Sequence, residues 1–235
     1  MKYILYVLLL TGFVYPSEFY AKLEPVHTYI VKSSVNGKVI YSNSEVEGHS
    51  ANNDKIVEID SSVDQMELKQ INKKIKLISK MINIENKNYK RLKKVRTKSD
   101  FDKDVQLLKS LNLESSKADL LIKKAQLIDS IKKKSLIESS RYIYNINVKK
   151  DDYVTAGTIL YEAKDLSKGK LEIFIPINEV DSLKNKIIFL NGKQTDIKID
   201  KIYKVAHSKH ISSYKVDIIV PAPKIFSRLV KIEFK

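Results

Sequence analysis

Residues 62–96 read SVDQMELKQINKKIKLISKMINIENKNYKRLKKVR, and this stretch decides the fold. Apolar side chains recur along it at spacings of 3, 4, 3, 4, 7 and 3 residues, mostly with lysine and asparagine between them. The apolar positions are Leu68, Ile71, Ile75, Ile78, Ile82, Tyr89 and Leu92, and only Glu85 breaks the series. Such a heptad series is typical of a coiled-coil seam. It predicts a helix from Ser62 to about Arg96, roughly 50 Å long at about 1.5 Å per residue.

A second helix is expected after a break at residues 97–98. Ser99 can cap it, because Asp102 stands three residues later in the manner of a capping box. Its apolar series is looser, with a stutter in the middle, and we expect it to end around Glu138. The series consists of Phe101, Val105, Leu108, Leu111, Ala118, Leu121, Ala125 and Ile128. Two long helices with a tight connection pack antiparallel, so residues 62–138 predict one continuous coiled-coil α-hairpin with strands only outside it.

Strand signals flank this hairpin on both sides, which makes the predicted fold class α+β. The first strand region is about Val26 to Asp60 and contains Asn36-Gly37, a dipeptide that tolerates the positive φ angles of a tight hairpin turn. Strand signals resume at Tyr142, and Asn191-Gly192 is a second hairpin signal. The final region predicts a small antiparallel barrel or sandwich.

The strand regions before and after the hairpin are related to each other. A turn residue, a small or β-branched residue, a turn residue and a large apolar residue recur every third position in both. The matched positions are Gly48/Asp151, Ala51/Val154, Asp54/Gly157 and Val57/Leu160. Neither half can bury a core alone. We therefore expect the two halves to form one sandwich in which Val57 and Leu160 are both buried.

The N-terminus predicts export. Met1 and Lys2 form a short positive start, and residues 3–15 are an apolar run broken only by Thr11 and Gly12. This run matches the core of a signal peptide, whereas a membrane-spanning helix needs about 20 residues. Ser17 and Ala21 are the small residues near which cleavage could occur. An uncleaved N-terminal anchor in the inner membrane is the alternative.

The charge balance first suggests a polyanionic partner, because the formal net charge is +15. Only four of the basic residues are Arg, and the lysines look scattered along the sequence. Since Lys is the weaker choice for bidentate phosphate recognition, nucleic-acid binding is disfavoured. A solvated surface or attraction to an anionic membrane is favoured instead. The absence of cysteine excludes disulfides, thiolate metal sites and a cysteine nucleophile.

The sequence shows no catalytic constellation, so we expect neither an enzyme nor a cofactor. His207 and His210 have a spacing that could bind metal on a helix, but they fall in an expected loop, and no metal site is predicted. No glycine-rich phosphate loop and no nucleophile elbow occur. The pair Asp151-Asp152 is interpreted as a turn rather than as catalytic carboxylates.

The two half-motifs resemble those of the hemolysin-D-like periplasmic adaptors, also called membrane fusion proteins. The resemblance lies in Val35 to Val39, Glu47-Gly48 and Ile59-Asp60 on one side, and in Val148 to Gly157 on the other. It covers about residues 26–223. It implies a split lipoyl-like β-sandwich, or barrel-sandwich hybrid, with an inserted hairpin and a C-terminal β-barrel. Because the hairpin replaces the turn that carries the modified lysine of true lipoyl carriers, no lipoylation is expected.

On this basis the chain is divided into a signal peptide over residues 1–21, a sandwich over 22–61 and 139–167, the coiled-coil hairpin over 62–138 and the barrel over 168–235. The resemblance implies a periplasmic adaptor that assembles as a homo-oligomeric ring. Its partners would be an inner-membrane transporter and an outer-membrane channel of TolC type, and peripheral contact with the inner membrane is open. Little chain follows the barrel for a membrane-proximal domain. The substrate, the pump class and the stoichiometry stay open.

The resemblance also implies contact residues at the hairpin tip, namely Arg91, Val95 and Ser99. Channel-docking adaptors have an Arg, an aliphatic residue four positions later and a Ser at the start of the second helix. Arg91 and Val95 keep that spacing, which predicts that they share one face of the first helix. Alternatively, Arg91 is a solvated flank, Val95 ends the seam and Ser99 is only a cap. The alternative function is a secreted coiled-coil structural or surface protein without a transport partner; an enzyme-complex carrier domain is disfavoured.

Overall fold

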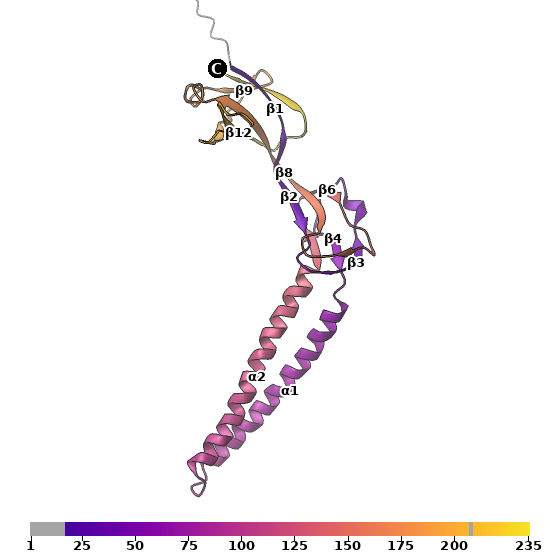
Figure 1. The fold of residues 1–235 in the computed structure, drawn as a ribbon, viewed down its shortest axis with the longest axis vertical. Coiled ribbons are helices and arrows are strands. Elements are labelled where there is room, and N and C mark those ends of the chain that lie inside the picture. Colours follow the sequence, from indigo (N-terminus) through magenta and orange to yellow (C-terminus); the bar gives the residue numbers. More distant parts are fainter. Residues whose placement is uncertain (1–16, 207–208) are drawn as a thin grey trace, which may run out of the picture. The chain divides into compact units, whose positions relative to one another are not determined.

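A computed structural model describes residues 17–206 and 209–235 of the chain. Two long helices dominate it, α1 (Ser62–Lys93) and α2 (Asp100–Lys133), which pack along each other and are joined by residues 94–99 (Figure 1). The positions that the sequence assigned to the seam of α1 are turned inward in the structure. All of these apolar positions are buried or half-buried, with Ile71 the most deeply buried, and Glu85 also faces inward.

Each helix of the hairpin ends earlier in the sequence than predicted. The first helix ends at Lys93 rather than at about Arg96, and the second ends at Lys133 rather than around Glu138. Residues Ser135–Glu138 form strand β5 instead, so the expectation of strands only outside 62–138 is wrong for this segment. Strand β5 pairs with β4 (Asp54–Ile59), which provides hydrogen-bond partners that override a sequence still compatible with helix.

The predicted apolar seam of α2 is also wrong. The apolar residues assigned to it, from Phe101 to Ile128, are all exposed in the described chain. The residues that face α1 lie one position earlier and mix apolar and polar side chains; they include Leu107, Ser110, Leu113, Lys117, Leu120, Lys124 and Leu127. Because successive residues on a helix are separated by about 100°, this one-residue offset moves the predicted stripe off the seam.

The Glu138 carboxylate anchors strand β5 in the sandwich. Its side chain is buried and accepts a hydrogen bond of 2.9 Å from the hydroxyl of Tyr161. The Arg141 guanidinium lies 3.2 Å from the same carboxylate and 3.9 Å from the centre of the Tyr29 ring. Burial, and then the nearby Glu138 charge, raise the pKa of Tyr161, so its hydroxyl stays protonated and donates. Because the buried Glu138 carboxylate has these two partners, Glu138 is stable in strand β5 rather than in the predicted helix.

The two strand regions around the hairpin form one sandwich, as predicted. One sheet has the order β5-β4-β3-β7, where β3 is Gly37–Ser42 and β7 is Tyr153–Val154. A short 3-10 helix, Ser44–Val46, precedes β4, and β6 (Tyr142–Ile146) pairs with β8 (Ile159–Pro176). Val57 and Leu160 both have no exposed surface and belong to the same core, which confirms the prediction made from the split repeat.

The turns of the split repeat use left-handed backbone conformations. Gly48 has a φ of 80° and its match Asp151 a φ of 78°, while Gly157 has a φ of 94°. In the first half the left-handed residue at the second turn is Asn53, with a φ of 58°, one position before the Asp54 that matches Gly157. The Asp54 carboxylate accepts a 2.8 Å hydrogen bond from the N–H of Asn52, which closes this turn without a glycine.

A second compact unit combines residues 17–28 with residues 164–235. One of its sheets has the order β1-β13-β9-β10, with β1 at Ser17–Lys22, β13 at Leu229–Phe234, β9 at Ile188–Leu190 and β10 at Lys193–Gln194. The other has the order β11-β12-β8-β2, with β11 at Ile199–Ile202, β12 at Ser213–Pro221 and β2 at Glu24–Lys32. A short helix α3 (Val180–Leu183) joins β8 and β9. Closure of these sheets into a barrel stays a prediction.

Strand β1 overlaps the end of the predicted leader, whose bounds stay a prediction. The apolar run at residues 3–15 lies outside the described residues, but Ser17–Ala21, also assigned to the leader, are part of β1. Ala21 is buried, and the Phe19 ring packs edge-on against Phe234 at a centroid distance of 5.8 Å. The unit also includes residues 17–28, which the predicted barrel boundary at 168 leaves out. Within the described residues, no helix is long and apolar enough to span a membrane.

Candidate functional site

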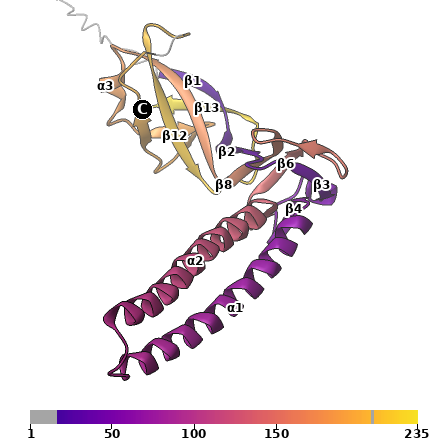
Figure 2. The same ribbon diagram turned by 60° about the horizontal axis from the view of Figure 1, so that its bottom comes forward.

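The three predicted contact residues lie in the last turn of α1 and in the connection that follows it, at the end of the hairpin away from the sandwich (Figure 2). Arg91, Val95 and Ser99 are all exposed there. The carbonyl of Arg91 accepts a hydrogen bond of 3.1 Å from the N–H of Lys94, which ends α1. Val95 follows the helix end, so the expected placement of Val95 on the first helix, one turn after Arg91, is wrong. The structure brings the three residues to one tip but leaves their role a prediction.

Ser99 is the N-cap of α2, as expected. Its side-chain oxygen accepts a hydrogen bond of 3.1 Å from the N–H of Asp102. Sequence reasoning missed the charge pairs that complete this cap. Lys103 donates to Asp100 at 2.9 Å, and this hydrogen bond lowers the pKa of the Asp100 carboxyl. Lys98 lies 4.0 Å from Asp102. These carboxylates also stabilise the positive end of the helix dipole.

The tip is strongly basic on the α1 side. Five basic residues lie at the end of the first helix or just after it: Lys90, Arg91, Lys93, Lys94 and Arg96. Among the described residues, none of them forms an ion pair. The acidic side chains nearby belong to the start of α2 and face lysines of their own segment. A partner for this side of the tip would therefore have to offer carboxylates or carbonyl groups.

Polar contacts between the helices set their register. The amide of Gln106 donates to the Glu85 carboxylate, and the Ser110 hydroxyl donates to the Asn86 side-chain oxygen at 2.6 Å. At the other end of the hairpin, Asp64 accepts from Ser130 at 3.0 Å and lies 2.9 Å from the Lys134 ammonium group. These pairs are formed by polar side chains, which a series of apolar positions does not include. Sequence periodicity therefore did not identify them.

The hairpin exposes two separate apolar surfaces. The α2 surface contains the residues that sequence analysis assigned to the seam, and Phe101 and Ile128 are 76% and 48% exposed. Ile122 lies beside this series and is also exposed. The α1 surface consists of Val63, Met66, Leu77, Met81 and Ile84. Isolated exposed apolar residues are normal, but long series of them mark interaction surfaces.

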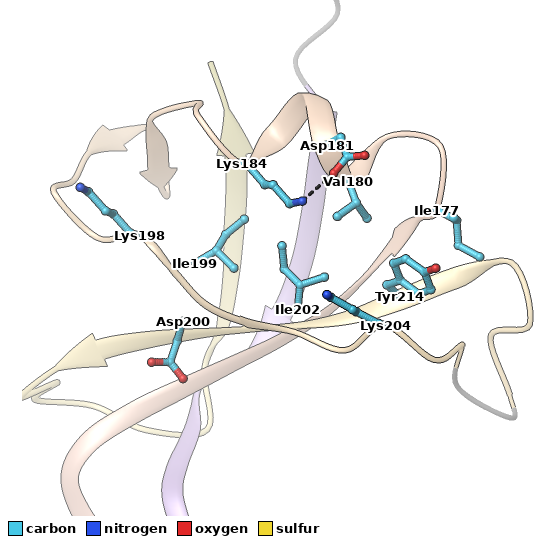
Figure 3. A pocket seen from close by; sticks show the side chains of 10 residues that line it. All are labelled: Ile177, Val180, Asp181, Lys184, Lys198, Ile199, Asp200, Ile202, Lys204 and Tyr214. Carbon is cyan, nitrogen blue, oxygen red and sulfur yellow. Dashed lines mark hydrogen bonds and ion pairs between the residues drawn. The ribbon is translucent and has the colours of Figure 1, made fainter.

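A pocket of about 630 Å³ lies in the β-rich unit, between α3 and strands β11 and β12 (Figure 3). Val180, Ile199 and Ile202 form its apolar part, and Lys184 at its rim pairs with Asp181 at 2.6 Å. No arrangement of nucleophile, base and oxyanion donors occurs among its lining residues. The pocket therefore gives no support for catalysis.

The histidines do not assemble a metal centre in the described part of the chain. His207 lies outside the described residues, whereas His210 stacks on the ring of Phe174 at a centroid distance of 3.9 Å. Within the described ranges, no group of three or more potential His, Asp or Glu ligands comes together.

Comparisons with known proteins identify the fold. No protein-family model matches the sequence, and a search of curated proteins finds no match. A MacA–MexA chimera that contains the Pseudomonas aeruginosa MexA α-hairpin domain aligns over 94% of this chain and 82% of its own, with a TM-score of 0.71 and 16% identity. The membrane fusion protein Spr0693 from Streptococcus pneumoniae aligns over 93% of this chain and 98% of its own, with a TM-score of 0.68 and 14% identity.

MacA from Actinobacillus actinomycetemcomitans is similar over 94% of this chain and 78% of its own, with a TM-score of 0.58 and 17% identity. These alignments extend over the sandwich, the hairpin and the β-rich unit. At such low identity they establish the fold and leave the partners open. The resemblance seen in the half-motifs is thus confirmed at the level of structure, and the chain has the fold of the membrane fusion proteins.

Proposed function

We propose that the protein is a periplasmic adaptor that links an inner-membrane transporter to an outer-membrane channel for the export of substrates. The observation that carries this proposal is the helical hairpin inserted between two halves of one sandwich, with an exposed basic tip. Such a hairpin places a contact surface far from the sandwich that holds it. The role is one of binding and positioning, and it requires no catalytic group.

The location proposed for this adaptor is the periplasm, reached through the N-terminal apolar segment as a signal peptide or with that segment retained as an inner-membrane anchor. The domain order proposed is the sandwich, the inserted coiled-coil hairpin and the β-barrel, with residues 17–28 added to the barrel because they share its core. The outer-membrane partner would be a channel of TolC type that meets the hairpin tip.

Charge reversal at the tip tests this proposal. We expect Arg91→Asp to reduce transport by at least about tenfold, because a like charge placed against a partner's carboxylates or carbonyls costs several kcal/mol at a contact. Arg91 is exposed, so the folded protein should keep its stability. The measurement is substrate export at equal protein level, together with cross-linking from the tip to the channel.

Lys109→Asp provides the matched control, since Lys109 is an exposed cation on α2 about 15 Å along the helix from Ser99. It should leave export unchanged. Full export by the Arg91 variant, with tip cross-links also absent, would remove the tip from the mechanism. Full export by a strain that lacks the protein altogether would favour the second candidate, a secreted coiled-coil structural or surface protein without a transport partner.

A homo-oligomeric ring is the proposed assembly. The hairpin presents one unpartnered apolar surface on α2 and a different one on α1. If the α2 surface of one copy meets the α1 surface of the next, the contact is heterologous and repeats around a closed ring. The two surfaces then exclude water from each other, which supplies the association energy that neither has in the single chain.

Polar substitution of the α2 surface tests the ring. We expect the double variant Leu121→Glu with Ile128→Glu to lower self-association at least about tenfold, because each buried Leu or Ile contributes roughly 1.5–3 kcal/mol. Both side chains are about half exposed in the single chain, so helix content should persist. Analytical ultracentrifugation gives the association constant. The control is Lys109→Glu with Gln126→Glu, which adds acidic residues at exposed polar positions and should associate normally. A wild-type chain that stays monomeric at every concentration would contradict the ring.

A further inference from the structure

The lysines of α1 form a single line along the helix. The expectation that the lysines are scattered is therefore wrong for this helix. Seven of them recur at spacings of 4, 3, 4, 7, 3 and 4 residues, and all are exposed. We call this set the lysine ladder; it consists of Lys69, Lys73, Lys76, Lys80, Lys87, Lys90 and Lys94. Asn83 occupies the one missing position of the heptad pattern.

The ladder lies on the side of α1 away from α2. Each of its residues follows an inward-facing residue by one or two positions, as Lys76 follows Ile75 and Lys80 follows Ile78. At about 100° per residue, this offset places the ladder roughly 150° from the seam. From Lys69 to Lys94 the helix rises by about 37 Å, so the ladder is a straight cationic line of that length.

The ladder has no counter-charge within the described chain. The acidic residues of α1 are Asp64, Glu67 and Glu85, and all three bond to residues of α2. None of the ladder lysines forms an ion pair in residues 17–206 or 209–235. Like charges three or four residues apart destabilise a helix, so the ladder lowers the stability of α1 in the isolated chain. An external anion would remove that repulsion.

The composition of the ladder indicates what kind of anion fits. All of its positions are Lys apart from Asn83, and it includes no apolar or aromatic residue. A protein partner needs an apolar centre to desolvate, and on α1 that centre is the α1 surface, whose Leu77 and Ile84 border the ladder without belonging to it. Lys acts as a point charge without the planar fork of Arg, so it sets little demand on ligand shape. Such a line suits a flexible polyelectrolyte, whose binding comes mainly from counterion release.

We propose that the lysine ladder of α1 binds a linear anionic polymer of the cell envelope, one whose phosphate or carboxylate groups repeat along an extended chain. The choice of an envelope polymer rests on the proposed extracytoplasmic location, whereas the binding itself depends only on the ladder. The polymer lies along α1 and contacts successive lysines. This anchors the hairpin to the material through which it passes and leaves the tip at Arg91 free for its partner.

The test is binding of the full chain to two labelled probes, inorganic polyphosphate and polygalacturonate, over a series of salt concentrations. The ladder variant replaces Lys69, Lys76, Lys80 and Lys87 with Gln, which has a similar helix propensity. We expect it to lose at least about tenfold in affinity, and its plot of log affinity against log salt to flatten by about 0.7 for each contacting lysine removed. Circular dichroism should show equal or higher thermal stability, because like-charge repulsion is relieved.

A matched control removes four exposed lysines elsewhere, by replacing Lys149, Lys168, Lys193 and Lys224 with Gln. It has the same net charge and should keep nearly all of the affinity. Equal losses in both variants would overturn the proposal, since net charge alone would then explain binding. Absence of binding to both polymers would overturn it as well. So would ladder-dependent binding to phosphatidylglycerol vesicles but to neither polymer, which would assign the ladder to a membrane surface. Export by the ladder variant is measured separately, so failure here is distinguishable from failure of the adaptor role.

Discussion

Val57→Asp is expected to unfold the sandwich. Val57 lies in β4 with no exposed surface, opposite Leu136 of β5, within a core made almost entirely of aliphatic side chains. A carboxylate there has neither water nor a cation, and an unpaired buried charge costs several kcal/mol. A domain's net stability is only about 5–15 kcal/mol, so most of the population should lose the fold. Urea unfolding followed by circular dichroism measures the change.

The effect of Val57→Asp should depend on pH. Burial raises the pKa of the introduced carboxyl in the folded state above its unfolded value of about 4. The destabilisation is therefore smallest below that pH and grows as the pH rises through it. Ile137→Asp is the matched control, because Ile137 belongs to β5, next to Leu136, but is 55% exposed. Comparable stability losses in the two variants would mean that the core does not join the two halves of the repeat.

A chain that begins at Leu23 is expected to lose the cooperative unfolding of the β-rich unit. Removal of β1 takes away the strand that pairs with one edge of β13 from Leu229 to Phe234, whereas the pairing of β13 with β9 on the other edge remains. It also removes the buried Ala21 and the Phe19 ring that packs on Phe234. The lost backbone hydrogen bonds, each contributing about 0.5–1.5 kcal/mol, and the lost packing together are comparable to the stability of a small unit. Hydrogen exchange of the β13 amides measures the loss directly.

The control is a chain that begins at Ser17, which retains all of β1. It should protect the β13 amides fully, and both chains should keep the helical signal of the hairpin, which belongs to the other unit. If a leader is removed in the cell, mass spectrometry of the mature protein should place its first residue at Ser17 or earlier. Equal protection of β13 in both chains would show that β1 is dispensable.

The contrast between the two helices shows how far periodicity predicts packing. In α1 almost every inward position is apolar, so the seam could be identified from spacing alone. In α2 the inward positions alternate between Leu113, Leu120 and Leu127 and the polar Ser110, Lys117 and Lys124. A richer apolar series follows one residue later, and spacing favours it. Contacts with α1 determine which of the two series faces inward, because Ser110 bonds to Asn86 and Lys123 bonds to Glu67.

Local chemistry predicted one member of the candidate site well and another badly. Ser99 was identified as a cap because a cap depends on residues close in sequence, here Asp102. The end of α1 was misplaced because residues 94–98 contain no Gly or Pro to mark it, so Val95 was assigned to the helix. Strand β1 was missed for a similar reason. Its partner is the last strand of the chain, and no local pattern reports such a distant pairing.

The pairing of β1 with β13 also dictates the order in which the protein can fold. Ser17 pairs with Phe234, so the first described strand has no neighbour on that side until the final residues have emerged. Residues 29–163 form their own compact unit, and its core is made of residues that precede the last third of the chain. The hairpin and sandwich can therefore fold first, while β1 has no strand partner during synthesis or translocation. Closing so long a loop is slow, so β1 stays unpaired until the chain is complete.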